Sequence, residues 1–208
     1  MTKRLLACAL LFLMAALPIG AARGAAGQDP AAFINDLGNQ ALQVSGPSVP
    51  LDQRIARFNE LFRSDFDIDR LGQFVLGPYA RAATPEQRRQ FLNAFQNSIV
   101  SAYAKRFGEY AGEPFRVTGV RQGGNVFIVS SEIVRRSGGP VTIDWSLESE
   151  AGRLKITDVA IDGLSMRLQE RKLFGSLMHQ SGERFDIALI AFARAGGSPP
   201  QYGSSQPH

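Results

Sequence analysis

The spacing of apolar residues divides the chain into a helical part, an extended part and a second helical part. From Asp29 to Phe107 apolar residues recur every three or four positions, which is the spacing of a helix with one buried face. From Gly112 to Asp162 they recur at every second position, which is the spacing of a strand. The helical spacing returns after Gly163. This order predicts an α+β fold with a sheet between two groups of helices.

The clearest helix start lies at Thr84. Its hydroxyl can cap the first turn, Pro85 occupies the first helical position, and Gln87 completes a capping box. An apolar stripe about six turns long follows and ends before Gly108. Its members are Phe91, Leu92, Phe95, Ile99, Ala102, Tyr103 and Phe107. Weaker signals predict further helices at residues 29–45, 51–63, 67–75, 165–180 and 185–193.

The extended part predicts four strands, at residues 115–121, 125–136, 141–149 and 153–162. Short turns containing glycine separate them, which is typical of an antiparallel meander. We therefore expect a curved four-stranded antiparallel sheet wrapped by the N-terminal and C-terminal helices. Such a wrapped sheet could enclose an apolar cavity, although periodicity alone does not distinguish a cavity from a filled core.

Residues 1–26 resemble a secretory signal peptide. Lys3 and Arg4 precede an apolar run from Leu5 to Leu17, and small residues follow up to Ala26. The run is too short for a comfortable membrane span. Cleavage would leave residues 27–195 as a single domain and residues 196–208, rich in Gly, Ser and Pro, as a disordered tail.

Removing this leader changes the charge and the cysteine count. Without Lys3, Arg4 and Arg23, 20 of the 23 basic residues remain against 19 acidic residues, so the net charge falls from +4 to about +1. Nothing in this charge predicts nucleic-acid binding. The one cysteine, Cys8, also leaves with the leader, which excludes a disulfide or a cysteine metal site in the mature chain.

The sequence offers little catalytic chemistry. Its two histidines are His179 and His208, and they form no metal-binding motif. The carboxylates of residues 65–69 lack the glycine and glutamate of a calcium loop. Asp158 shares the predicted pleat face of Leu154 and Ile156, and a structural carboxylate is the favoured interpretation over a catalytic one. We expect no enzyme activity, no metal and no cofactor.

Basic residues gather on two of the predicted helices. They form either solvated helix faces or a docking surface for an acidic partner or an anionic lipid head group. The residues concerned are Arg81, Arg88, Arg89, Lys105 and Arg106 around the long helix, and Arg167, Arg171 and Lys172 on the penultimate one.

Several motifs in a fixed order resemble the MlaC family, also called the toluene-tolerance auxiliary family. They are Leu76-Gly77-Pro78-Tyr79, Ala83-Thr84-Pro85-Glu86-Gln87, Tyr110-Ala111-Gly112-Glu113, Val141-x-Ile-Asp-Trp145, Asp162-Gly163-Leu164-Ser165-Met166 and Arg171-x-x-Phe174. The resemblance extends from about Phe58 to Phe192. One departure is Tyr79-Ala80-Arg81, where the family commonly has Tyr-Trp-Arg.

The resemblance implies that residues 27–195 form a periplasmic lipid-binding domain that acts as a monomer. Such a carrier shuttles phospholipid between two membrane complexes and maintains outer-membrane lipid asymmetry. The implied partners are an inner-membrane ABC transporter complex with an MCE-domain protein and an outer-membrane lipoprotein–porin complex, each docked transiently. The alternatives are a hopanoid or other lipid as cargo, a non-catalytic adaptor with a filled core, and a hydrolase that uses carboxylates.

A lipid carrier must hide hydrocarbon from water. Two acyl chains hold on the order of 30 methylenes, and exposing them would cost roughly 20 kcal/mol at about 0.8 kcal/mol each. We expect the cavity to be lined by apolar residues of the helices and strands, each of which could equally be plain core. They are Phe74, Val75, Tyr79, Phe95, Ile99, Tyr103, Phe127, Val129, Trp145, Leu147, Val159, Ile161, Leu164, Met166 and Leu173. The hydroxyls of Tyr79 and Tyr103 could lie at the cavity mouth.

Overall fold

The computed structural model describes residues 28–46, 48–110 and 112–195. The predicted signal peptide and the predicted tail lie outside these residues. The helices are α1 (Pro30–Gln43), α2 (Leu51–Asp65), α3 (Ile68–Leu76), α4 (Pro85–Phe107), α5 (Met166–Gln180) and α6 (Phe185–Ala195). Two 3₁₀ turns, η1 (Gly77–Ala80) and η2 (Gly108–Tyr110), follow α3 and α4. The strands are β1 (Phe115–Gly123), β2 (Val126–Ile133), β3 (Val141–Glu150), β4 (Arg153–Ile161) and β5 (Leu164–Ser165).

The α+β class and the antiparallel meander are confirmed, but the sheet has five strands in the order β1-β2-β3-β4-β5 instead of four. The additional strand pairs Ser165 with Ala160 and Leu164 with Ile161. Asp162 and Gly163 both adopt positive φ angles, of 46° and 79°, and turn the chain back onto β4. A strand of two residues has no alternation, so the apolar pattern could not reveal it.

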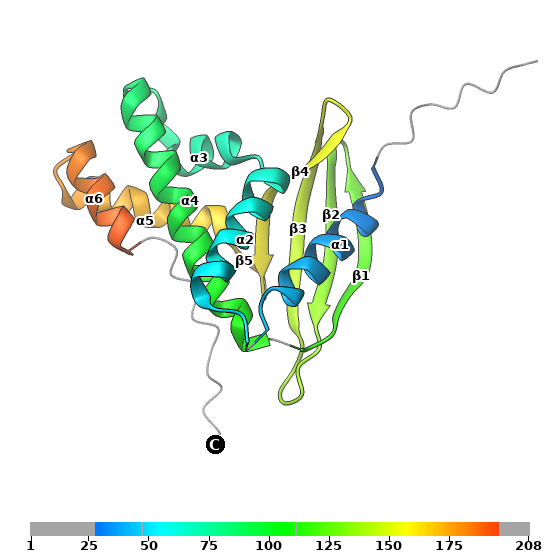
Figure 1. The fold of residues 1–208 in the computed structure, drawn as a ribbon. Coiled ribbons are helices and arrows are strands. Elements are labelled where there is room, and N and C mark those ends of the chain that lie inside the picture. Colours follow the sequence, from blue (N-terminus) through cyan, green and yellow to red (C-terminus); the bar gives the residue numbers. More distant parts are fainter. Residues whose placement is uncertain (1–27, 47, 111, 196–208) are drawn as a thin grey trace, which may run out of the picture.

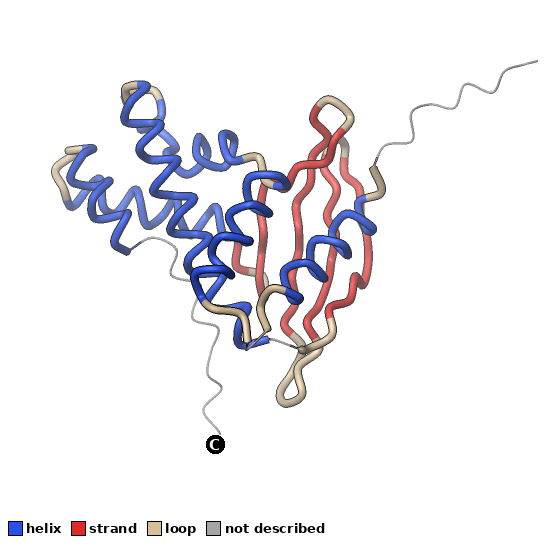
Figure 2. Tube along the Cα trace, in the orientation of Figure 1, coloured by secondary structure: helices blue, strands red, loops and turns tan. Residues whose placement is uncertain are grey.

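The helices form two groups (Figure 1 and Figure 2). The first group, α1 and α2, lies across one face of the sheet, with α1 against β1 and β2 and α2 against β4. The second group, α3, α5 and α6, gathers beside the sheet, where α5 contacts α3, α6 and β4. The long helix α4 contacts α2 in the first group and α3 and α6 in the second. The C-terminal helices therefore extend the fold sideways more than they wrap the sheet.

The predicted helix starts are formed by the expected side chains. The hydroxyl of Thr84 accepts a hydrogen bond from the Gln87 amide at 3.1 Å, and the Gln87 side chain accepts from the Thr84 amide at 2.9 Å. Asp29, Asp67 and Ser165 likewise accept from amides in the first turns of α1, α3 and α5. These local bonds satisfy amides that would otherwise lack a partner, which is why the helices begin where the sequence predicts.

The first half of α4 belongs to a filled aromatic core. Phe91 lies with its ring centroid 6.1 Å from that of Phe95, 4.8 Å from Phe174 and 5.2 Å from Phe192. Phe185 continues this cluster, 5.6 Å from Phe174. The edge-on contact of Phe91 with Phe174 and its tilted contact with Phe192 fasten α4 to α5 and α6. Side chains therefore fill the space beside this half of the helix.

A bulge in β4 overturns one prediction about Asp158. Ser146 of β3 pairs with Asp158, whereas the next residue, Leu147, pairs with Ile156, so Thr157 is an extra residue in β4. The extra residue reverses the alternation along the strand. Asp158 therefore lies on the face opposite Ile156, and the prediction that they share a face is wrong.

The Asp158 carboxylate joins β4 to the start of α5. It accepts hydrogen bonds from the amide of Val159 at 2.9 Å, from the amide of Arg167 at 3.1 Å and from the hydroxyl of Ser165. The guanidinium of Arg167 lies 3.4 Å from the same carboxylate. A carboxylate bound to a helix N-terminus in this way stabilises the helix and holds it against the sheet.

Candidate apolar binding cavity

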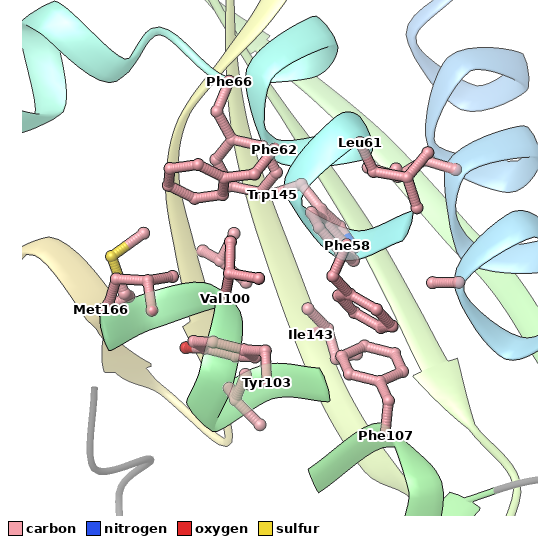
Figure 3. A pocket seen from close by; sticks show the side chains of 15 residues that line it. Phe58, Leu61, Phe62, Phe66, Val100, Tyr103, Phe107, Ile143, Trp145 and Met166 are labelled. Carbon is pink, nitrogen blue, oxygen red and sulfur yellow. The ribbon is translucent and has the colours of Figure 1, made fainter. Parts of the chain in front are cut away.

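An apolar cavity lies between α1, α2 and α4 on one side and β3 and β4 on the other (Figure 3). It encloses about 60 Å³. The residues that line it are Leu37, Ala41, Phe58, Leu61, Phe62, Phe66, Ile99, Val100, Tyr103, Phe107, Ile143, Trp145, Val159, Ile161 and Met166. A single ordered water needs about 10–15 Å³ of such space, so the cavity has room for only a few water-sized groups.

Of the 15 lining side chains, only Tyr103 and Trp145 carry a nitrogen or oxygen atom. The indole N–H of Trp145 donates to the Ser131 hydroxyl at 2.8 Å, and that hydroxyl donates to the Ile143 carbonyl at 3.3 Å. The indole nitrogen is thus satisfied by the sheet, and the indole ring is left to line the cavity. A wall of this composition offers hydrocarbon contacts and would leave a polar ligand without partners.

The spacing of residues along each helix or strand determines which of its side chains line the cavity. In α2, Phe58, Leu61 and Phe62 are three and four residues apart and lie on one side of the helix. In the sheet, Trp145 of β3 pairs with Val159 of β4 on the inner face. Ring contacts close the helical side, with Phe58 5.3 Å from Phe107 and Phe62 4.4 Å from Phe66.

Six of the 15 residues that the sequence suggested for the lining are brought together at this cavity. They are Ile99, Tyr103, Trp145, Val159, Ile161 and Met166. Whether these six contact a lipid stays a prediction. They come from the second half of α4, from β3 and β4, and from the first residue of α5, so four separate segments converge.

The other nine suggested residues lie elsewhere. Val75, Phe95, Val129 and Leu147 are buried in the core, and Phe127 and Leu173 pack against it. Leu164 is 45% exposed. Two aromatic residues lie at the second helical group, Phe74 in α3 and Tyr79 in η1, which follows α3. The guanidiniums of Arg167 and Arg171 lie 4.6 and 4.9 Å from the Phe74 ring, and the Tyr79 ring lies 6.1 Å from that of Phe174.

The surroundings of Tyr79 do not fit a position at the cavity mouth. Burial raises the pKa of its hydroxyl above the ordinary value of 10.0, and the nearby Glu183 carboxylate raises it further. Glu183 belongs to the turn between α5 and α6. Tyr79 therefore connects η1 with that turn.

Sequence reasoning missed nine lining residues: Leu37, Ala41, Phe58, Leu61, Phe62, Phe66, Val100, Phe107 and Ile143. A signal was present for some of them. Phe58 and Phe62 lie on the predicted apolar side of their helix, and Ile143 shares a predicted strand face with Trp145. The missing information was that α1 and α2 cover the sheet at this place, because periodicity identifies a buried face but not its partner.

A second hollow lies between α1 and the end of α2, and it is larger and polar. It measures about 320 Å³ and is lined by Gln28, Asp29, Ala32, Phe33, Asp36, Leu37, Gln40 and Asp65. Burial raises the pKa of the Asp65 carboxyl above its usual value of 3.8. Despite its size, this hollow is a poor place for hydrocarbon because carboxylates and amides line it. Across the described residues, no group of three or more His, Cys, Asp or Glu side chains is placed to hold a metal ion.

Within the part of the chain that the structure describes, no helix is both long enough and apolar enough to cross a membrane.

Comparison with known proteins decides the family. The family model described as MlaC protein matches residues 40–189. The chain belongs to the MlaC family. All the cavity-lining residues except Leu37 fall within the matched region, so the cavity is built almost entirely from the part of the chain that defines membership of the MlaC family.

Two curated relatives resemble the chain at low identity. The toluene tolerance protein ttg2D of Pseudomonas putida is 23% identical over 151 residues, which cover 72% of this chain and 70% of that protein. The intermembrane phospholipid transport system binding protein MlaC of Haemophilus influenzae is 25% identical over 138 residues. That alignment covers 64% of each chain, slightly less than two thirds of the relative's length.

A solved structure has the same fold. It is the phospholipid-binding protein from Ralstonia solanacearum in complex with a phospholipid, and it matches with a TM-score of 0.68 at 20% identity. The match covers 80% of this chain and 95% of the other. This MlaC-family chain therefore shares its fold with a protein whose structure contains a phospholipid.

Proposed function

We propose that this protein is a periplasmic carrier that binds the acyl chains of a phospholipid in the cavity between α2, α4 and the sheet. The observation that carries the proposal is the wall of the cavity, where 15 side chains present only two nitrogen or oxygen atoms and Ser131 already binds one of them. The names of the Haemophilus and Ralstonia proteins, which refer to phospholipid transport and phospholipid binding, support the same cargo.

The cavity must widen to hold this cargo. Its volume of about 60 Å³ compares with roughly 300–1,000 Å³ for ordinary small-molecule pockets. Ring contacts of Phe58 with Phe107 and of Phe62 with Phe95, and a hydrogen bond of 3.0 Å from the Gln96 amide to Asn59, hold α2 to α4 on the helical side of the cavity. We infer that acyl chains enter by separating α2 and α4 from the inner face of the sheet, since apolar contacts with protein are then replaced by apolar contacts with lipid.

The cellular role follows from family membership and remains a proposal in each detail. The carrier exchanges lipid with an inner-membrane ABC transporter complex that contains an MCE-domain protein and with an outer-membrane lipoprotein–porin complex. It thereby maintains the lipid asymmetry of the outer membrane. It acts as a monomer without cofactor or metal, and it binds lipid without transforming it.

Lipid extraction tests the carrier function. The purified protein is extracted with organic solvent and the extract is analysed by mass spectrometry, before and after incubation with phospholipid vesicles. We expect co-purified or acquired phospholipid at up to one molecule per chain. The same spectrum identifies the head group, and a hopanoid in place of a phospholipid would change the cargo but not the mechanism.

Two substitutions connect the lipid to the cavity. Ile161→Glu introduces a carboxylate into the wall and should lower lipid loading more than about tenfold, because an unpaired buried charge costs several kcal/mol. Ala41→Leu fills space with an apolar side chain and should lower loading while the fold is retained. Val120→Glu and Ala193→Leu, at exposed positions, are the matched controls. Normal loading in a folded Ala41→Leu variant would place the lipid elsewhere.

The small volume of the cavity also favours a second candidate, a non-catalytic adaptor with an essentially filled core. The same extraction separates the two functions. A folded protein that neither carries lipid nor takes it from vesicles is an adaptor.

A further inference from the structure

The start of α5 carries exposed leucines beside exposed cations. Leu164 is 45% exposed and Leu168 is 48% exposed, and Arg171 and Lys172 are exposed as well. We call these four residues the α5 surface. Exposed single leucines are common on soluble proteins, so the grouping with cations is the feature that needs a reason.

Helix geometry places these residues together. Leu168 precedes Arg171 by three positions and Lys172 by four, so all three lie on one side of α5. Leu164 lies in β5, four residues before Leu168. Met166, which lies between the two leucines in the sequence, is 4% exposed and lines the cavity. The α5 surface is thus formed by the same short segment that supplies part of the cavity wall.

Among the described residues, no carboxylate is paired with the cations of this surface. Across the residues that the structure describes, neither Arg171 nor Lys172 forms an ion pair with a carboxylate, whereas the neighbouring Arg167 pairs with Asp158. The one acidic residue of α5, Glu170, is only 5% exposed. Farther along the helix the exposed side chains are Ser176, His179 and Gln180. The exposed side of α5 therefore carries the cations Arg171 and Lys172 and no exposed carboxylate.

We infer that the α5 surface contacts a lipid bilayer with anionic head groups. Leucines beside lysine and arginine are the composition of helices that lie at a membrane surface, where the apolar side chains enter among the head groups and the cations approach phosphates. The cations require a negatively charged counterpart, and the leucines require one that also accepts apolar side chains. An anionic bilayer provides both over a wide area, whereas an acidic protein surface would need a matched apolar pocket.

The biological purpose of this contact rests on the proposed carrier function. A carrier that contacts a bilayer beside its cavity shortens the path of the lipid through water. The test of the contact does not depend on that function. Sedimentation measures binding of the purified protein to vesicles of neutral phosphatidylcholine and to vesicles that also contain anionic phosphatidylglycerol. We expect binding to the anionic vesicles and a decrease in binding as salt is raised.

Four variants locate the contact. Lys172→Gln should weaken binding to anionic vesicles about fivefold, the value for one cation near the surface, and Leu168→Ser should weaken it to a similar degree. Arg153→Gln is the control for charge, because Arg153 begins β4 about 27 Å along the strand from the end that pairs with β5. Val120→Ser is the control for apolar exposure, because Val120 is 44% exposed on β1 at the opposite edge of the sheet.

Each outcome is decisive. Equal binding to neutral and anionic vesicles, or equal losses in the control variants, overturns the inference. The inference is also overturned if the parent protein binds no vesicles but binds a purified acidic protein, and if Lys172→Gln loses that binding. The α5 surface would then contact a protein partner. If the protein loads lipid but does not bind vesicles, only the proposed membrane contact of the α5 surface is refuted. If the protein binds vesicles through this surface but never loads lipid, only the proposed carrier function is refuted.

Discussion

At the scale of single residues, the cavity depends on where the few polar atoms of its wall are bonded. Trp145 shows this most clearly, because its large ring lines the cavity while its N–H donates to Ser131 at 2.8 Å. Ser131 is itself 2% exposed, so no water can replace it easily. One serine in the sheet therefore allows a tryptophan to act as an apolar wall residue.

Ser131→Ala should destabilise the protein by about 1–3 kcal/mol, because it leaves the buried indole N–H without a partner. Denaturant unfolding measures the change. The double variant with Trp145→Phe removes the N–H as well, so its loss of stability should be smaller than the sum of the two single losses. Simple additivity would show that the hydrogen bond contributes nothing. Ser176→Ala, at an exposed position in α5, is the control.

Asp65 should make stability depend on pH in the direction opposite to most surface carboxylates. Because burial raises its pKa in the folded protein above 3.8, the folded state binds the proton more tightly than the unfolded state. The resulting stability is fully present below pH 3.8 and is lost as the pH rises through the folded pKa.

We therefore expect Asp65→Asn to melt at a higher temperature than the parent protein at neutral pH, and the difference to vanish below pH 3.8. Thermal unfolding at a series of pH values measures it. Glu150→Gln, at the exposed end of β3, should give no such gain. A variant that is less stable than the parent at neutral pH would contradict the assignment.

At the scale of elements, α4 serves two different structures. Its first half packs Phe91 and Phe95 into the aromatic core, and its second half presents Ile99 and Tyr103 to the cavity. The apolar stripe of α4 therefore packs into a filled core along its first half and lines a cavity along its second half. The stripe is visible in the sequence, but the change of partner along it is not.

The capping box of α4 should affect stability without affecting the cavity. Thr84→Ala removes a hydroxyl that binds the Gln87 amide and should cost about 1 kcal/mol, within a usual range of about 0.5–2 kcal/mol. Thr84→Ser keeps the hydroxyl and should retain most of that stability. Urea unfolding measures both, and lipid loading of the folded Thr84→Ala variant should match the parent. A loss of loading there would mean that the two halves of α4 are coupled.

The fold and the cavity differ in how far the sequence could predict them. Helix starts such as Thr84 and Ser165 were predictable because their signals are local hydrogen bonds. The face of Asp158 was not, because one extra residue at Thr157 reverses the alternation without any change in composition. The lining supplied by α2 was not predictable either, because Phe58 and the strand residues that line the same cavity are far apart in the chain.

At the scale of the whole molecule, the two helical groups have different structural roles. The group around Phe174 is tightly packed and joins the sheet through Asp158 and the start of α5. The group of α1 and α2 covers the cavity and is tied to β4 near Phe66, where the Asp67 amide donates to the Ile156 carbonyl at 3.0 Å. The widening proposed above would move α2 and the second half of α4 away from the sheet and leave the aromatic core around Phe174 in place.

The wall of the cavity also limits what the protein can distinguish. Tyr103 and Trp145 carry the only polar side-chain atoms of its 15 lining residues, so nearly all of its contacts with a tail would be apolar and would not depend on hydrogen bonding. A methylene more or less in such a site changes affinity by only about 1–3 kcal/mol. If the protein is the proposed phospholipid carrier, the size of the tails and contacts outside the cavity decide which lipids it binds, and lipids with different tails should compete for it with nearly equal affinity.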